Sequence, residues 1–271
     1  VVSTKLMVLR NISKDVETRY VYNFLTYKGV LDYLQMIAEN RIASFPQITF
    51  NIVKKLKIKI LDKDKQKKIN NIISLFDDKI KKNILLINEL VNYSNKLFQF
   101  WFYQFEYPNK KNASYNSNGG EMREHPNIPY KFPKNWNVIT LRELIKNDDT
   151  GDWGSEKSRG NYKNKVVCLR GTDLDGINGN ENLEAPTRYI LDTNLNKILK
   201  DHDLVIEISG GSTNQSTGRI SLITEPLRNR INQNLICSNF CKFIELKDKR
   251  YSYYFYFLWN NLYINNIFFF I

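Results

Sequence analysis

Cysteine and histidine are scarce in this sequence, which contains three Cys and two His in 271 residues. An odd, small number of cysteines argues against a disulfide framework and indicates a reducing compartment, for which we expect the cytoplasm. Cys237 and Cys241 have the spacing of half a metal site, but His125 and His202 lie far from them in the sequence. We therefore expect both cysteines to be buried in strands, and we expect neither a metal site nor a cofactor.

Long uninterrupted hydrophobic runs are also lacking, and no secretory signal peptide is visible. The C-terminal segment 251–271 is rich in Tyr and Phe, but asparagines interrupt it repeatedly, so we expect no membrane span. The sequence begins at Val1 without Met and ends in the apolar run 267–271. We expect it to be incomplete at both ends.

The signatures of two enzyme classes are missing or partial. A DNA methyltransferase needs an Asn/Asp-Pro-Pro-Tyr/Phe motif and a glycine-rich cofactor loop after a strand, and the sequence has neither. Glu245-Leu246-Lys247 resembles the Glu-x-Lys of metal-dependent nucleases but lacks a Pro-Asp partner at the usual distance. We expect a non-catalytic protein and name no catalytic residue. A nuclease, or a combined restriction and methylation enzyme fragment, is the alternative.

Positive charge is abundant: the formal net charge is +12 and the pI is about 9.4. Residues 54–82 alone contain eleven Lys and four Asp, a net charge of +7. This balance suits a polyanionic partner such as DNA. A Lys-rich chain also arises from AT-rich coding, and a charge run is usually a solvated helix face. Charge alone therefore leaves both interpretations open.

A heptad pattern without Pro or Gly runs from about Asp64 to Tyr103 and predicts one long helix of the coiled-coil type. Asn83 and Ser94 are polar positions in the pattern, where a buried Asn would set the register of packing, although drift of the seam onto the surface is an equal alternative. The residues expected to pack against another helix are Ile69, Ile73, Phe76, Ile80, Asn83, Ile87, Leu90, Leu97 and Trp101.

The rest of the chain predicts an α+β fold with short strands and long loops. Shorter helices are expected at 20–38, 141–146 and 251–263, a turn at 45–49, and a polar linker at 110–127. Strands are expected at 1–9, 53–61, 136–140, 165–170, 204–209, 219–224 and 235–246.

An internal repeat is suggested by two matches. Residues 237–244 share the pattern of residues 2–9, and Tyr253, Phe257 and Leu258 match Tyr20, Phe24 and Leu25. A genuine repeat would make residues 128–271 most of a second copy of a module whose tail is residues 1–60. Coincidence is the alternative.

Several short motifs then occur in the order found in one known family. They are Ile128-Pro129 with Pro133-Lys134-Asn135-Trp136 and Leu141-Arg142-Glu143-Leu144, Leu204–Gly211, Gln215–Arg219, Gln66-Lys67-Lys68-Ile69, and Phe98–Phe102 before Tyr107-Pro108. Together they resemble the DNA-specificity subunit of type I restriction–modification systems, over almost the whole chain.

The resemblance implies a domain plan and a function. Residues 1–62 would be the C-terminal part of a first target-recognition domain, 63–107 the conserved spacer helix, 108–127 a linker, and 128–271 a second target-recognition domain lacking its C-terminal end. Such a subunit reads one part of a bipartite site in double-stranded DNA and has no catalysis of its own. It docks DNA methyltransferase subunits, and a restriction subunit joins them. A homodimer through the spacer helix is also expected, and a DNA-independent coiled-coil interaction protein is the remaining alternative.

The glycine-rich loop 209–219 is the sharpest candidate site. Its short polar side chains suit phosphate oxygens or base edges, and Asn and Gln pair well with adenine. A solvated hairpin loop is the alternative. The predicted contacts are Thr213, Asn214, Gln215, Thr217 and Arg219, and exchange of Gln215 or Arg219 for Ala is expected to change sequence preference.

Two further stretches gain weight from the resemblance, which implies DNA-facing loops near them. In the loop after Asp149, the predicted contacts are Trp153, Arg159 and Lys163, although Trp153 could instead cap the core. At the end of the strand 165–170, Arg170 and Thr172 are expected near DNA, and the alternative is that Arg170 pairs with Asp173.

Overall fold

The computed structural model describes residues 6–40, 47–177, 183–210 and 215–267. The chain forms two compact units, Val1–Ile84 and Leu85–Ile271. We describe each unit by itself. Helices and short strands are combined in one chain, so the predicted α+β class is confirmed.

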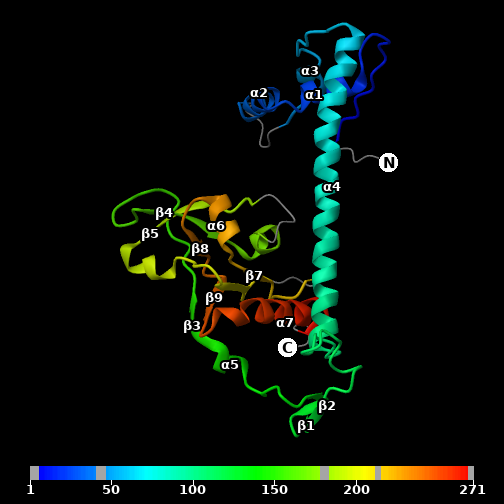
Figure 1. The fold of residues 1–271 in the computed structure, drawn as a ribbon. Coiled ribbons are helices and arrows are strands. Elements are labelled where there is room, and N and C mark those ends of the chain that lie inside the picture. Colours follow the sequence, from blue (N-terminus) through cyan, green and yellow to red (C-terminus); the bar gives the residue numbers. More distant parts are fainter. Residues whose placement is uncertain (1–5, 41–46, 178–182, 211–214, 268–271) are drawn as a thin grey trace. The chain divides into compact units, whose positions relative to one another are not determined.

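The predicted long helix is confirmed as α4 (Lys63–Phe102), which Figure 1 draws without a break. Its 40 residues correspond to about 60 Å at 1.5 Å per residue. The helix ends where Phe105 takes a positive φ of 60° and the Glu106 N–H donates to the Phe100 carbonyl at 2.9 Å. This geometry satisfies a carbonyl of the last turn and stops the helix.

In the first unit the single helix predicted at 20–38 is two helices, α1 (Thr18–Leu25) and α2 (Lys28–Glu39). The break follows Thr26, whose hydroxyl donates to the Tyr22 carbonyl at 2.9 Å, and Tyr27 is extended. Side-chain bonds of this kind compete with continuing helix. A one-turn helix, α3 (Phe50–Val53), was not predicted.

The two strands predicted in the first unit are wrong for the residues that the structure describes. Residues 6–10 contain no strand, while 1–5 lie outside the described part, as do residues 45 and 46 of the predicted turn. The segment 53–61 begins in α3 and continues without strand pairing. Alternating side chains suit a strand, but a strand needs a neighbour for its backbone groups. No described segment of this unit pairs with either one.

Gln66 fixes the start of α4 to the chain in front of α1. Its side chain is fully buried, and its Oε1 accepts from the Glu17 N–H at 2.8 Å. Its Nε2 donates to the carbonyls of Asp15 at 3.0 Å and Leu61 at 2.8 Å. One amide therefore satisfies three backbone groups on two separate segments.

The second unit contains two sheets in which strands far apart in sequence are neighbours. One has the order β3-β9-β6-β7 and is antiparallel; the other has the order β5-β4-β8, with β4 parallel to β8. The strands are β3 (Ile145–Thr150), β4 (Asn164–Leu169), β5 (Thr187–Ile190), β6 (Leu204–Glu207), β7 (Ile220–Leu222), β8 (Leu235–Cys237) and β9 (Cys241–Leu246).

Three predicted strands are confirmed as β4, β6 and β7, and the strand predicted at 235–246 is divided between the two sheets. The chain turns at Ser238, where the Cys241 N–H donates to the Ser238 carbonyl at 3.0 Å. The sheets are joined by this turn. Strands β3 and β5 were not predicted.

A hairpin begins within the end of the expected linker, 110–127, and extends beyond it. It consists of β1 (Met122–His125) and β2 (Ile128–Pro133). The strand predicted at 136–140 is wrong, because this segment has no strand pairing and leads into α5 (Leu141–Leu144). Pairing of β1 with β2 satisfies the local backbone, and Trp136 packs on Phe105 and Phe102 instead.

Two longer helices complete this unit, α6 (Glu225–Ile231) and the predicted α7 (Ser252–Ile264). The 3-10 turns are η1 (Gly171–Asp173), η3 (Asp192–Lys197) and η4 (Lys249–Tyr251). Among the described residues, no helix has both the length and the apolar character that crossing a membrane requires.

All three cysteines are buried and unpaired, which confirms the expectation for Cys237 and Cys241. Cys237 and Cys241 belong to a core cluster with residues of β4, β6 and β9, and Cys168 belongs to a second cluster around β4 and β5. Burial raises the pKa of Cys168 to about 12 and that of Cys241 to about 11, and it raises the pKa of Cys237 as well. These thiols are structural.

Candidate nucleic-acid interface

The loop after β3 is held against the edge of β5. The Ser155 N–H donates to the Tyr189 carbonyl, and the Tyr189 N–H donates to the Ser155 carbonyl, both at 2.9 Å. Asp152 fixes the preceding turn by accepting from the Gly154 N–H at 3.0 Å and from the Asn194 side chain at 2.7 Å. The Asp152 carboxylate is thus occupied inside the fold.

Two glycines allow this loop to approach the sheets. A Cβ on Gly151 would lie 1.8 Å from the Cys237 carbonyl oxygen. Gly154 has a φ of +61°, and a Cβ there would lie 2.6 Å from the Tyr189 carbonyl oxygen. Both positions therefore require glycine, and this close approach of the backbone on either side of Trp153 fixes the position of that residue.

Trp153 has two environments. One part of its ring packs against the core cluster that contains Val166 and Ile190, as the core-capping alternative proposed. The Arg188 guanidinium lies over the same ring, with its central carbon 4.0 Å from the ring centroid. A cation at this distance from an indole face is attracted by the ring. Arg188 lies in β5 opposite Val166 and was not recognised in the sequence.

A cavity of about 310 Å³ opens at this pair. Its charged residues are three cations and the single carboxylate of Glu156, which lies 3.2 Å from the Arg188 Nη1. The side chains of Lys157 and Arg159 are exposed. The lining residues are Trp153, Gly154, Ser155, Glu156, Lys157, Arg159 and Arg188.

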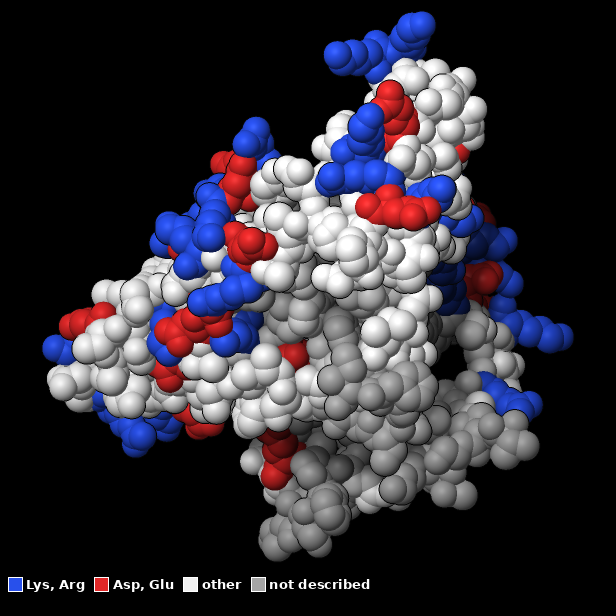
Figure 2. Space-filling model, turned by 90° about the horizontal axis from the view of Figure 1, so that it is seen from below, with Lys and Arg blue, Asp and Glu red and all other residues white. Residues whose placement is uncertain are grey.

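The structure brings Trp153 and Arg159, two predicted contacts, to one cavity, and leaves Lys163 exposed on the following segment. On the face drawn in Figure 2, the basic side chains are interleaved with acidic ones. An aromatic ring with three cations around a cavity suits a ligand that combines planar rings with negative charge, such as a nucleic acid.

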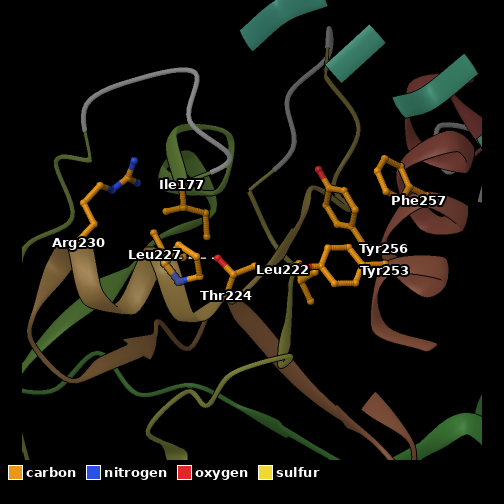
Figure 3. Close-up of a pocket in the computed structure, with 9 residues that line it drawn as sticks. Ile177, Leu222, Thr224, Leu227, Arg230, Tyr253, Tyr256 and Phe257 are labelled. Atoms are coloured by element: carbon orange, nitrogen blue, oxygen red, sulfur yellow. Dashed lines mark hydrogen bonds between the residues drawn. The ribbon is translucent and has the colours of Figure 1, made fainter. Parts of the chain in front are cut away.

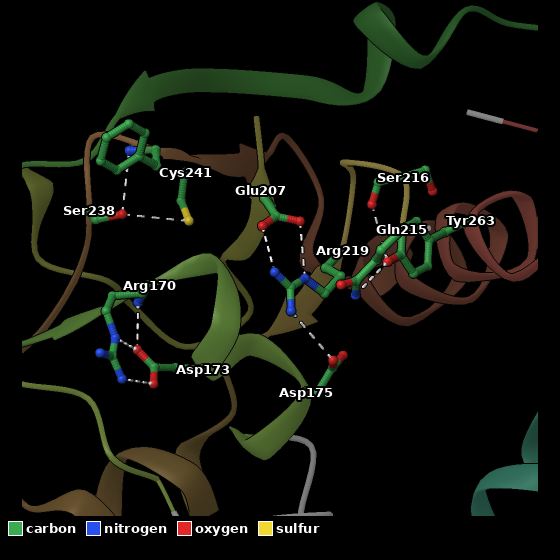
Figure 4. A network of polar contacts seen from close by, with 11 residues as sticks. Arg170, Asp173, Asp175, Glu207, Gln215, Ser216, Arg219, Ser238, Cys241 and Tyr263 are labelled. Atoms are coloured by element: carbon green, nitrogen blue, oxygen red, sulfur yellow. Dashed lines mark hydrogen bonds and ion pairs between the residues drawn. The ribbon is translucent and has the colours of Figure 1, made fainter. Parts of the chain in front are cut away.

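Arg170 is paired inside the protein, as the structural alternative proposed. Its Nε and Nη2 donate to the two carboxylate oxygens of Asp173, each at 2.8 Å, and its own N–H donates to Asp173 Oδ2 at 2.8 Å (Figure 4). The pair raises the pKa of Arg170. Thr172 is exposed beside it. Contact of either residue with DNA stays a prediction.

Arg219 is buried and engaged from two sides. Its Nε and Nη2 donate to the two carboxylate oxygens of Glu207 at 3.0 and 2.6 Å, and Asp175 lies 3.8 Å from its Nη1 (Figure 4). Gly171 and Gly210 both leave room for the Glu207 carboxylate. In this conformation Arg219 points into the protein, so a DNA contact through it would require these bonds to open.

The described end of the glycine-rich loop is fastened to α7. Gln215 is exposed, and its Nε2 donates to the Tyr263 hydroxyl at 3.4 Å. The Tyr263 hydroxyl donates to the Ser216 carbonyl at 3.3 Å, and the Trp259 indole N–H donates to the Gly218 carbonyl at 2.8 Å. Thr217 is half-buried. The predicted contacts Thr213 and Asn214 lie outside the described residues.

A second cavity, of about 400 Å³, lies between β7, α6 and α7 (Figure 3). Most of its lining is apolar or aromatic, including Leu222, Leu227 and Tyr256, and Arg230 is the charged residue at its edge. Thr224 holds one wall in place by accepting from the Leu227 N–H at 3.4 Å. This lining suits an apolar group better than a phosphate.

The predicted packing seam of α4 is only partly buried within each unit. In the first unit Ile69 and Ile73 are half-buried, whereas Phe76, Ile80 and Asn83 are exposed. In the second unit Ile87, Leu97 and Trp101 are half-buried and Leu90 is exposed. Ser94 is half-buried, and its hydroxyl donates to the Leu90 carbonyl at 2.9 Å.

The strongest packing of α4 on α7 comes from a residue outside the seam. Phe98 is buried, and its ring stacks on Phe257 with centroids 5.7 Å apart. Phe102 meets Tyr254 edge-on at 4.9 Å, and Gln99 donates to the Asn261 Oδ1 at 3.0 Å. The aromatic residues at 98–102 were the sequence signal that could have predicted this packing.

The first two residues of the nuclease-like triplet, Glu245 and Leu246, end strand β9. Glu245 lies in β9 and accepts from the Lys146 ammonium at 2.8 Å, which lowers its pKa. Among the described residues there is no group of three or more His, Cys, Asp or Glu arranged to hold a metal ion.

Residues 1–92 match the family model described as "Type I restriction modification DNA specificity domain". Two curated proteins are similar. The specificity subunit of the type I restriction enzyme HindI of Haemophilus influenzae is 37% identical over 124 residues, 46% of this chain and 27% of that protein. The MjaIX specificity subunit of Methanocaldococcus jannaschii is 27% identical over 136 residues, 50% of this chain and 29% of that protein.

Two solved structures are similar at low identity. One is the HsdS subunit from Thermoanaerobacter tengcongensis, with 14% identity and a TM-score of 0.33 over 92% of this chain and 55% of that chain. The other is described as showing complex assembly and conformational transition of the type I R-M system, with 13% identity and a TM-score of 0.36 over 92% and 54%. Scores below 0.5 do not establish a common overall fold.

The family model and the curated relatives agree with the motifs found in the sequence. The matches span less than a third of either curated relative's length. On these findings residues 1–92 match the specificity-domain model of type I restriction–modification systems, and the chain is similar to the specificity subunits of such systems.

Proposed function

We propose that this chain recognises DNA sequence for a type I restriction–modification complex and carries out no catalysis itself. It would read one part of a bipartite site in double-stranded DNA, dock DNA methyltransferase subunits, and work with a restriction subunit. The match of residues 1–92 to the specificity domain is the observation that carries this proposal. The cavity at Trp153 and Arg188 supports it, because this cavity offers cations and an aromatic face together.

The test is an exchange of residues 128–271 for the equivalent segment of a relative with a different target. The readout is a map of methylated sequences in the host genome before and after the exchange. We expect one part of the bipartite motif to change while the other part and the spacing stay the same. If the first exchange abolishes all methylation, a second exchange, of residues 63–107 alone, serves as the control. It should leave both parts of the recognised motif unchanged. An unchanged motif after the first exchange would overturn the proposal.

The exposed apolar residues of α4 support a further part of the proposal, namely that this helix pairs with a second copy of the chain. A soluble protein rarely exposes so many large apolar side chains along one helix. They are Ile72, Leu75, Phe76, Ile80, Ile84, Leu85, Leu86, Leu90 and Tyr93.

Sedimentation of the purified chain tests this pairing. Ile80→Glu should shift a dimer to monomer by placing a charge in the apolar seam. Lys79→Gln changes the net charge by the same amount without altering the seam, and should leave the dimer intact. A monomeric parent protein, or equal behaviour of the two variants, would contradict pairing of copies and leave a methyltransferase subunit as the expected occupant.

A further inference from the structure

We propose that Arg188 is a specificity-determining residue that binds the edge of a guanine, with Trp153 as its support. The inference rests on the proposed function, because it assumes that this domain meets duplex DNA. Arginine pairs with guanine by donating two hydrogen bonds to O6 and N7, and this is the most common specific contact in the major groove.

The side chain of Arg188 is held in place before any ligand arrives. Only 9% of it is exposed, and its guanidinium lies 4.0 Å from the centre of the Trp153 ring. Trp153 is itself fixed by the core cluster below it and by the hydrogen bonds of Ser155 and Tyr189. A guanidinium plane fixed in this way loses little freedom when it binds, which favours recognition of a planar acceptor pair.

The guanidinium also has unused donor capacity. Its Nε is buried and has no hydrogen-bond partner among the described residues. Leaving a buried donor unpaired costs free energy. An acceptor that enters the cavity and bonds to this Nε would remove that cost, which favours binding.

The present partner of Arg188 is easily replaced. Glu156 lies 3.2 Å from Nη1, but 80% of its side chain is exposed. Exposed ion pairs contribute little stability because solvent and salt screen them. Glu156 therefore acts as a stand-in for the ligand: it neutralises the guanidinium in the free protein and can turn away when a base edge arrives.

The residues around Arg188 suit a guanine that remains within a DNA strand, with a phosphate on either side. Lys157 and Arg159 line the same cavity and are exposed, so they can meet the phosphates on either side. Arg170 and Arg219, by contrast, each donate two hydrogen bonds, from Nε and Nη2, to the two oxygens of one carboxylate. Among these three arginines, Arg188 is the one that has the weakest internal bonding.

The experiment selects bound sequences from a random duplex library, using the chain of residues 1–271 and its Arg188→Lys variant. The parent should enrich a motif that contains guanine, and the lysine variant should lose preference at one guanine. Replacing that guanine by 7-deazaguanine removes the N7 acceptor. It should weaken binding by the parent about tenfold or more and leave binding by Arg188→Lys nearly unchanged.

Arg188→Lys keeps the positive charge and the stem, so it is suitable even if Arg188→Ala fails to fold. Glu156→Gln is the matched control, and should keep the motif while binding it slightly more tightly. A motif that is identical in the parent and in Arg188→Lys would overturn the inference. So would a uniform loss of affinity in Arg188→Ala that lysine restores, since that indicates a phosphate contact. Enrichment of no motif by the parent would instead overturn the proposed function.

Discussion

Glu207 and Arg219 are joined by two hydrogen bonds, Nε to Oε2 at 3.0 Å and Nη2 to Oε1 at 2.6 Å, and both residues are buried. The pair ties β6 to the residue just before β7, next to the glycine-rich loop. It fixes the base of that loop.

Arg219→Ala should lower the free energy of unfolding by about 3–5 kcal/mol, because it leaves the Glu207 carboxylate buried without its cation. Chemical denaturation followed by circular dichroism measures this. Arg250→Ala is the control, since the side chains of Arg250 and its partner Asp248 are 86% and 32% exposed, so its loss should cost far less. Adding Glu207→Gln to Arg219→Ala should restore part of the lost stability. Equal losses in the two arginine variants would contradict the assignment.

Gln66→Ala should destabilise the first unit by about 1–3 kcal/mol, because three backbone groups of residues 15, 17 and 61 lose their partner in a buried place. Hydrogen exchange of the amides in residues 6–40 reports this opening. Gln99→Ala on the same helix removes a single part-buried hydrogen bond, to Asn261, in place of three, so its effect should be smaller. Unchanged exchange in Gln66→Ala would show that other contacts hold the segment.

Gly154→Ala should destabilise the protein much more than Gly160→Ala. Both glycines have a positive φ, +61° and +54°, so both substitutions incur the backbone cost of about 1–2 kcal/mol. At Gly160 a Cβ meets nothing within 4 Å, whereas at Gly154 it would lie 2.6 Å from the Tyr189 carbonyl oxygen. Thermal denaturation compares the two. Similar melting temperatures would mean that the loop can move away from β5.

Asp203→Asn should stabilise the protein near neutral pH. Burial, aided by the charge of Glu245, raises the pKa of Asp203 to about 6. The folded state therefore binds a proton more tightly than the unfolded state, whose pKa is near 3.8. Stability from this group is present at low pH and is lost as pH rises from about 4 to about 6. Denaturation at pH 4.5 and 7.5 should show a smaller difference in the variant than in the parent.

Long periodic or continuously apolar segments were predictable from the sequence. The heptad seam gave α4 almost to the residue, and the run Leu204-Val205-Ile206 gave β6. The errors arose where local pattern lacked a partner, as at 53–61, whose alternating side chains suit a strand that nothing in the described unit pairs with. A strand depends on its neighbour, and one sequence does not show the neighbour.

The candidate site was only half predictable for the same reason. Trp153 and Arg159 stood out because they lie in and just after the polar loop that follows Asp149. Arg188 lies within a short strand, where the local sequence suggests only a surface cation. Only the pairing of β5 with β4 and with Ser155 brings it to Trp153. A better signal was available for α6, where Thr224, Glu225 and Pro226 form an N-terminal capping sequence.

The reaction rate of the three buried cysteines can report how often the sheets of this domain open. At pH 7.5 their raised pKa values keep the thiolate population very small, and the sheets shield the sulfurs from reagents. A maleimide dye can react only when β4, β8 or β9 opens, so its rate of incorporation reports how often the two sheets separate. Slowing of that rate on addition of duplex would time complex formation without any engineered label.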